Sequence, residues 1–163
     1  MSSRSDGFAR VVVITDTRER QPYGFDPGRV TTVRRALRSG DYSLEGFEER
    51  VAVERKTLDD FAQSLIRARE RFLAEMRRLE SFDAACVVVE GSLRDLMEGK
   101  AATGAHPSSL LGAALSLIVD HGIPVFFCSD RQAACRFVEG YLLRVHRKMT
   151  GQWEPKPQQS AGK

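Results

Sequence analysis

The sequence predicts an α/β fold in which a mixed, mostly parallel central β-sheet is flanked by helices on both faces. Short runs of β-branched residues recur along the chain, as expected of strands that are buried on both faces of a sheet. In the second half they alternate with segments whose apolar residues recur every three or four positions, a pattern typical of helices. Such alternation favours crossover connections between parallel strands. The length of 163 residues suits one compact domain.

The first half of the chain predicts four strands. The β-branched run 11–15 is the first, and residues 29–35, which alternate weakly, are a candidate for the second. A turn at 39–41 leads into residues 42–44. We expect this short segment to pair antiparallel with a strand over 51–55, so that the two form a hairpin.

The second half predicts three helices and two further strands. From residue 57 to 79 the apolar residues have helical spacing, which indicates one amphipathic helix of about six turns. A proline at the start and a glycine after the end bound the second helix. The remaining predicted elements are strands over 86–89 and 124–128 and helices over 107–121 and 131–148.

Composition excludes several classes of protein. No apolar run approaches the about 20 residues needed to span a bilayer, and the N-terminus lacks the apolar stretch of a signal peptide. Three cysteines without a CxxC pair predict a reduced, cytoplasmic setting and, with only three histidines, argue against zinc. We expect the folded domain to cover 11–150, between a flexible N-terminus at 1–10 and a disordered polar tail at 151–163.

One pattern of charged residues carries the chemistry. Asp41 begins one strand of the predicted hairpin, and Glu54, Arg55 and Lys56 lie on its partner. Residues two apart in a strand point to the same face, so Glu54 and Lys56 project together and Arg55 projects to the other side. Two carboxylates beside an amine suit phosphodiester hydrolysis with Mg²⁺, because the carboxylates leave coordination positions open for water and phosphate. By itself the pattern also fits a hairpin whose charged side chains are exposed to water and have no catalytic role.

Two more acidic residues flank this pattern. Asp16 follows the first predicted strand, at an edge of the sheet where ligands commonly bind, although it also suits a turn. Asp60 lies in the first turn of the predicted helix after Lys56. With Thr57 it fits a capping box, and it also suits a supporting role beside the site; the two roles are compatible.

These residues resemble the nuclease domain of the XPF/Hef family of structure-specific endonucleases, part of the PD-(D/E)XK restriction-nuclease-like superfamily. The shared pattern is Asp16-x-Arg18-Glu19, Gly40-Asp41-Tyr42 and Val53-Glu54-Arg55-Lys56-x-x-x-Asp60. The resemblance, over about residues 11–148, implies a restriction-endonuclease-like fold and a nuclease that uses Mg²⁺ or Mn²⁺. It implies that the metal ligands are Asp41, Glu54 and Asp16, and that the catalytic group also includes Lys56, Arg55 and Asp60.

Arginines cluster after this pattern. One stripe of the predicted helix would contain Asp60, Ser64, Arg67, Arg71 and Arg78. Such a stripe could track a DNA backbone, or it could be a solvated face paired with nearby glutamates. Relatives have an arginine in a Gly-Arg-Leu segment that this chain lacks, and either Arg69 or Arg71 could match it. The residues expected to contact DNA are Arg18, Arg67, Arg69 and Arg71.

The predicted function is metal-dependent endonucleolytic cleavage of DNA at branches, flaps or single-strand/double-strand boundaries, in repair or recombination. The alternatives are a defence or mobile-element nuclease of the same fold and a catalytically silent DNA-binding subunit. The predicted helical segment 110–119 is apolar on more than one face, so it is either deeply buried or half of a dimer interface. Because relatives dimerise through this half, we expect a homodimer or heterodimer through the C-terminal half, and no membrane partner.

Overall fold

The computed structural model describes residues 10–152 of the chain. The flexible N-terminus expected over 1–10 and the polar tail expected over 151–163 lie outside this range, apart from residues 10, 151 and 152. Among the described residues, none of the helices combines the length and apolar character that crossing a membrane requires.

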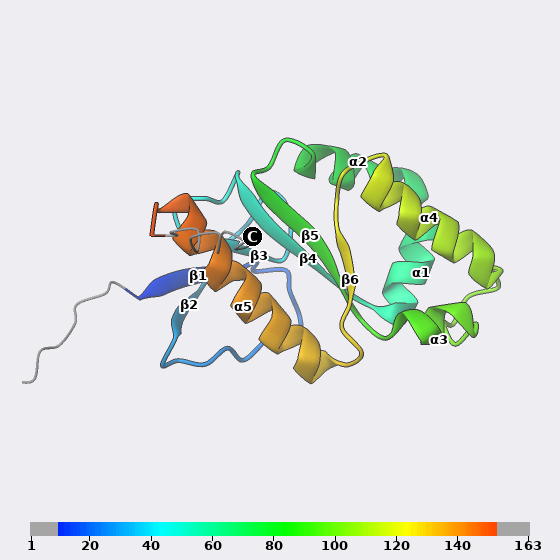
Figure 1. Ribbon diagram of the computed structural model, residues 1–163, viewed down its shortest axis with the longest axis horizontal. Helices are drawn as coiled ribbons and strands as arrows, with labels where there is room; N and C mark the ends of the chain where they lie inside the picture. The colour runs from blue at the N-terminus through cyan, green and yellow to red at the C-terminus, as the bar shows by residue number, and fades with distance from the viewer. Residues whose placement is uncertain (1–9, 153–163) are drawn as a thin grey trace, which may run out of the picture.

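Six strands form one mixed sheet: β1 Val11–Thr15, β2 Val30–Arg34, β3 Tyr42–Leu44, β4 Val51–Thr57, β5 Ala84–Glu90 and β6 Val125–Phe127. Their order in the sheet is β2-β1-β3-β4-β5-β6 (Figure 1). Parallel pairing joins β1 to β2, β4 to β5 and β5 to β6, whereas β3 runs antiparallel to both of its neighbours. The predicted mixed sheet and its hairpin are therefore confirmed.

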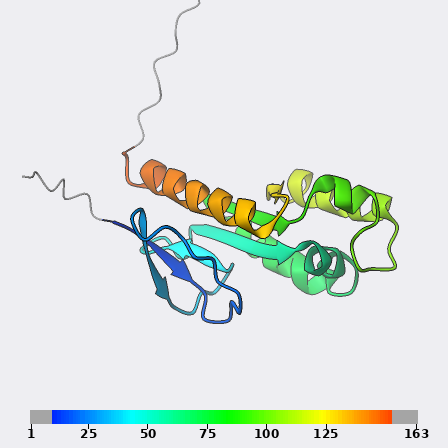
Figure 2. The same cartoon turned by 90° about the horizontal axis from the view of Figure 1, so that it is seen from below.

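Five helices accompany the sheet: α1 Leu58–Ile66, α2 Arg69–Leu79, α3 Leu93–Met97, α4 Pro107–Val119 and α5 Arg131–Met149. The long helix α5 packs against β1, β3 and β5 on one face. On the other face α1 packs against β4 and β5, and α4 packs against α1 and β6. Figures 1 and 2 show the resulting layers, with the sheet between α5 and the group of α1 and α2.

Alternation along β4 divides the core into two parts. Ala52 packs with side chains of α1, α2 and α4, including Phe61. Val51 and Val53 point the opposite way and pack with side chains of α5, including Val138. Because successive strand residues point to opposite faces, the same alternation sends the next residues of β4 to alternate sides of the sheet.

The prediction of a single helix over 57–79 is wrong, because the structure has two helices there, α1 and α2. The backbone leaves helical geometry at Ala68, which has φ −115° and ψ 26° and offers α2 no side-chain cap. Apolar residues from both helices, such as Leu65 and Phe72, enter the same core. The apolar period therefore continues across the break, and this period is what the sequence prediction used. The five-residue helix α3 was not predicted, since it is too short to show a period.

Candidate functional site

Asp41 lies where three strands of the sheet meet. It directly precedes β3, and its backbone N–H donates to the carbonyl oxygen of Val53 on β4 (2.9 Å). Its own carbonyl oxygen accepts from the N–H of Asp16, at the end of β1 (2.8 Å). The carboxylate oxygen Oδ2 accepts from the backbone N–H of Arg55 (2.8 Å). The sheet itself therefore fixes both the backbone and the carboxylate of Asp41 beside β4.

The turn that carries Asp41 requires a glycine at the position before it. Gly40 has a φ of +79°, and a Cβ there would lie 3.0 Å from Cβ of Ala52 and 3.2 Å from the carbonyl oxygen of Val53. Any side chain would thus meet both an unfavourable backbone conformation and close atoms. The glycine lets the chain turn tightly against β4.

We expect Gly40→Ala to lower the free energy of unfolding by about 1–3 kcal/mol, measured by urea denaturation. The matched control is Gly140→Ala within α5, where open space surrounds the Cβ position. That change should leave stability unchanged or raise it by up to about 1 kcal/mol, because alanine favours a helix. Equal stability of the two variants would contradict the strained turn.

Glu54 and Lys56 share the face of β4 that α1 and α2 cover. The carboxylate of Glu54 is buried, and its Oε1 lies 3.5 Å from Nζ of Lys56. The ammonium group of Lys56 also lies 5.3 Å from the centre of the Phe72 ring on α2, a cation–π distance. The predicted common orientation of Glu54 and Lys56 is therefore confirmed.

Burial disfavours the ionised forms of both Asp41 and Glu54. Burial raises the pKa of Asp41 to about 6; the Arg55 N–H opposes this shift, and the negative charge of Glu19 adds to it. Burial, followed by the charges of Asp41 and Glu75, raises the pKa of Glu54 well above its usual range, while Lys56 opposes the rise. A carboxyl group with a raised pKa costs folding stability when it is ionised, and the cost disappears as pH falls through that pKa. A cation held between the two groups would remove the same cost at neutral pH.

Arg55 lies on the opposite face, as predicted, in a cluster that the sequence did not reveal. Its Nε donates to Oε1 of Glu90 at the end of β5 (2.5 Å), and its NH1 group donates to Oε1 of Glu19 (3.4 Å). Glu90 also accepts a hydrogen bond from the Tyr23 hydroxyl (2.7 Å). Glu19 is buried, and its place three residues after Asp16 is the signal that could have singled it out.

Asp16 holds the neighbouring loops together. It is 2% exposed; its Oδ1 accepts from the backbone N–H of Leu37 (3.0 Å) and its Oδ2 from Nε of Arg18 (2.8 Å). Both oxygens are thus already in use. Within residues 10–152 no group of three or more His, Cys, Asp or Glu residues is arranged to hold a metal ion. The role of Asp16 as a third metal ligand stays a prediction.

Asp60 lies in the first turn of α1, where Thr57 caps the helix. Its N–H donates to Oγ1 of Thr57 (3.1 Å), and its side chain is exposed, so the capping interpretation is confirmed for the threonine half of the box. The single stripe of side chains predicted to start at Asp60 is not formed, because α1 and α2 are separate helices and Ser64 is buried. The arginines expected to contact DNA are all exposed: Arg18, Arg67, Arg69 and Arg71.

Asp41 and Glu54 offer the donor set that a hard divalent ion needs. Oδ1 of Asp41 and Oε2 of Glu54 accept no hydrogen bond from any residue between 10 and 152. Magnesium is commonly bound through one or two carboxylates and keeps several of its waters. Two desolvated carboxylates with free oxygens therefore fit such an ion without a third protein ligand.

Comparison with known proteins identifies the family. The ERCC4 domain family matches residues 15–141. The chain belongs to this family. It is thus an ERCC4 domain, as the nuclease domains of XPF and Hef are, which confirms the resemblance inferred from the charged motif.

Solved structures agree with this ERCC4 assignment. XPF from Aeropyrum pernix matches with a TM-score of 0.64 at 26% identity, covering 86% of this chain and 68% of that one. XPF from Aeropyrum pernix in complex with DNA matches with a TM-score of 0.63 at 28% identity, covering 86% and 66%. A Methanocaldococcus jannaschii protein assigned as an ATP-dependent RNA helicase is 30% identical over 122 residues. That match covers 75% of this chain but only 14% of the relative. The α/β fold predicted from the sequence is confirmed.

Proposed function

We propose that this protein is a DNA endonuclease that requires Mg²⁺ or Mn²⁺ and acts at branched, flap or single-strand/double-strand-junction DNA in repair or recombination. The observation that carries the proposal is the pair of desolvated carboxylates, Asp41 and Glu54, held beside the ammonium group of Lys56. Membership of the ERCC4 family supports nuclease chemistry. The DNA complex of the similar Aeropyrum pernix XPF supports DNA as the substrate.

In this proposal Asp41 and Glu54 hold the ion, which would neutralise charge on the phosphate and lower the pKa of bound water. Lys56 donates to a phosphate oxygen or holds the attacking water, since its Nζ lies 3.5 Å from Glu54. The backbone N–H of Arg55 keeps the Asp41 carboxylate in place, while the Arg55 side chain ties β4 to β5. The acidic cluster is completed by Asp16, and Asp60 supports the start of α1.

The proposed partners are DNA and a second subunit. The exposed residues Arg18, Arg67, Arg69 and Arg71 would contact the DNA backbone without reading its sequence. Helix α4 exposes Leu115, Ile118 and Val119, the last to 76%. This apolar surface supports a homodimer or heterodimer through the C-terminal half of the chain.

The test is cleavage of a panel of labelled DNA substrates: flap, fork, four-way junction, bubble and plain duplex. We expect cuts near the branch with Mg²⁺ or Mn²⁺ and none in EDTA. Equal cleavage of plain duplex would favour a defence or mobile-element nuclease of the same fold. Binding without cleavage of any substrate under any metal condition would favour a silent DNA-binding subunit.

A further inference from the structure

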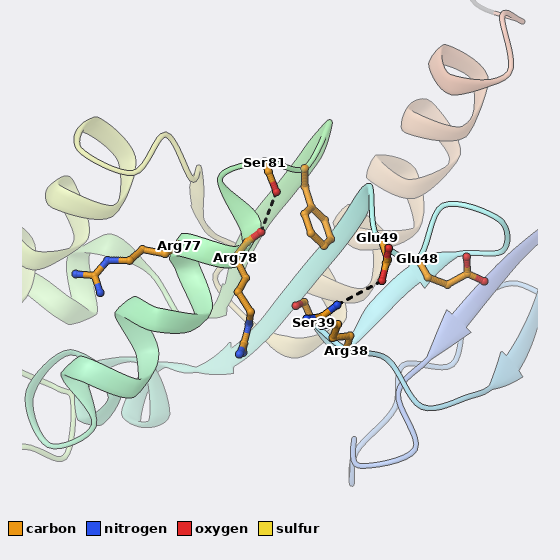
Figure 3. A pocket seen from close by; sticks show the side chains of 8 residues that line it. Arg38, Ser39, Glu48, Glu49, Arg77, Arg78 and Ser81 are labelled. Atoms are coloured by element: carbon orange, nitrogen blue, oxygen red, sulfur yellow. Dashed lines mark hydrogen bonds and ion pairs between the residues drawn. The ribbon is translucent and has the colours of Figure 1, made fainter.

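A cleft of 310 Å³ lies near the candidate site and is lined by none of Asp41, Glu54 and Lys56. It is bounded by the turn before β3, the connection between β3 and β4, and the C-terminal end of α2 (Figure 3). Arg38 and Ser39 line it from the turn, Glu48 and Glu49 from the connection, and Arg78 and Ser81 from the α2 side. Glu48 is already paired with Arg35, outside the cleft lining (3.2 Å). Figure 3 shows Arg78 on the side of α2 that faces Ser39 and Arg38, whereas Arg77 extends the other way.

Ser39 gives this cleft a hydroxyl group. The residue is 4% exposed and lines the cleft. A serine hydroxyl can donate a hydrogen bond to an anionic oxygen that enters the cleft. Gly40 fixes the turn against β4, which holds Ser39 in place.

The arginines of the cleft are weakly neutralised. Arg78 forms no ion pair with any residue from 10 to 152, and NH1 of Arg38 lies 3.8 Å from Oε1 of Glu49. Both side chains of that pair are largely exposed, at 81% and 76%, so the pair contributes little stability. A phosphate group would compete well for Arg38, because guanidinium groups bind phosphate through two parallel hydrogen bonds.

Two walls of the cleft lie close to the candidate site along the chain. Ser39 lies two residues before Asp41, which places their Cα atoms at most about 7 Å apart. On the other wall, Arg78 lies one helical turn after Glu75, whose charge acts on Glu54. A strand held at Asp41 and Glu54 would therefore pass the cleft within a few nucleotides, since successive nucleotides advance by about 3.4 Å.

We propose that this cleft binds a backbone phosphate of the DNA strand close to the cut bond, through Arg38, Arg78 and the hydroxyl of Ser39. The proposal rests on the proposed nuclease function and adds a substrate-binding position to it. The guanidinium groups supply the charge, and the Ser39 hydroxyl supplies a further hydrogen-bond donor. Such a contact adds affinity and fixes the path of the strand but reads no sequence.

The experiment measures binding of a labelled fork DNA in the cleavage-blocked Glu54→Gln background, by fluorescence anisotropy over a series of salt concentrations. We expect the added pair Arg38→Ala and Arg78→Ala to weaken binding about tenfold at low salt. The slope of log affinity against log salt should decrease by about 0.9, which corresponds to the one lost phosphate contact. The matched control, Arg136→Ala with Arg144→Ala on α5, removes two exposed arginines from the opposite face and should change affinity less than about twofold.

A second variant tests the same cleft through an expected increase in affinity for DNA. Glu49→Gln should tighten DNA binding about two- to threefold by releasing Arg38, and this gain should vanish when Arg38 is already alanine. The proposal is wrong if the arginine pair behaves like the α5 control. It is also wrong if inorganic phosphate perturbs the NMR signals of Arg38 and Arg78 while the pair leaves DNA affinity unchanged, because the cleft then takes a free anion. The binding and NMR measurements need no cleavage. A wild-type protein that cuts no DNA would therefore refute the proposed nuclease function, while the same measurements would still decide whether the cleft binds a DNA phosphate.

Discussion

Glu54→Gln is expected to reduce DNA cleavage by at least about 10³-fold while raising the thermal stability of the metal-free protein. The loss follows because glutamine cannot supply the charged oxygen that a divalent ion requires. The gain follows because the wild-type carboxylate is ionised at neutral pH only at a cost that burial and the charge of Asp41 impose. An increase in Tm of about 2–4 °C corresponds to about 1 kcal/mol in a chain of this size. Cleavage and thermal denaturation measure the two effects.

The pH dependence of this stability gain is fixed by the direction of the pKa shift. For the companion variant Asp41→Asn, the gain should be full above pH 6 and should fade as pH drops through about 6, where wild-type Asp41 takes up its proton. Added Mg²⁺ or Mn²⁺ should stabilise the wild type and leave both variants unchanged. Glu70→Gln is the control, since this glutamate of α2 is exposed and forms no ion pair with any residue between 10 and 152. Cleavage at the wild-type rate by both site variants would remove Asp41 and Glu54 as metal ligands.

Lys56→Met should lower the rate of cleavage by about 10²–10³-fold, a loss typical of removing one group that stabilises charge in a transition state. Methionine keeps the length of the side chain and its contact with the Phe72 ring, so the fold should persist. Stabilisation of the variant by Mg²⁺ or Mn²⁺ should remain, because the proposed ligand atoms are carboxylate oxygens and Lys56 supplies none of them.

Single-turnover cleavage with saturating DNA separates this effect from weakened substrate binding. Lys148→Met, on the exposed side of α5, removes the same charge far from the site and should cleave normally. If Lys56→Met cleaves as fast as Lys148→Met, then Lys56 has no part in the reaction. If it loses metal-induced stabilisation instead, its role is to organise Glu54.

The sequence predicted the features that depend on alternation and on short motifs. Strand alternation placed Glu54 and Lys56 on one face and Arg55 on the other, and the structure has them there. The hairpin prediction brought Asp41 next to β4, where the Arg55 N–H now holds it. Such predictions succeed because local backbone geometry alone decides which face a strand residue occupies.

Features that depend on backbone breaks and on distant contacts could not be predicted in the same way. The interruption at Ala68 leaves the apolar period intact, so the sequence gives no sign of it. Glu19 and Glu90 meet at Arg55 from segments that are 71 residues apart along the chain, and only tertiary packing brings them together. The cleft between Ser39 and Arg78 likewise depends on tertiary packing, since these residues are 39 positions apart along the chain.

The interruption at Ala68 makes α2 a helix separate from α1. Along its length α2 carries the aromatic ring under Lys56, the acid that acts on Glu54, and the arginine of the cleft, namely Phe72, Glu75 and Arg78. In the proposed complex, one helix would therefore position both the arginine that holds a DNA phosphate and the ring that contacts the Lys56 ammonium group. Substrate binding and the placement of Lys56 would then depend on the same element.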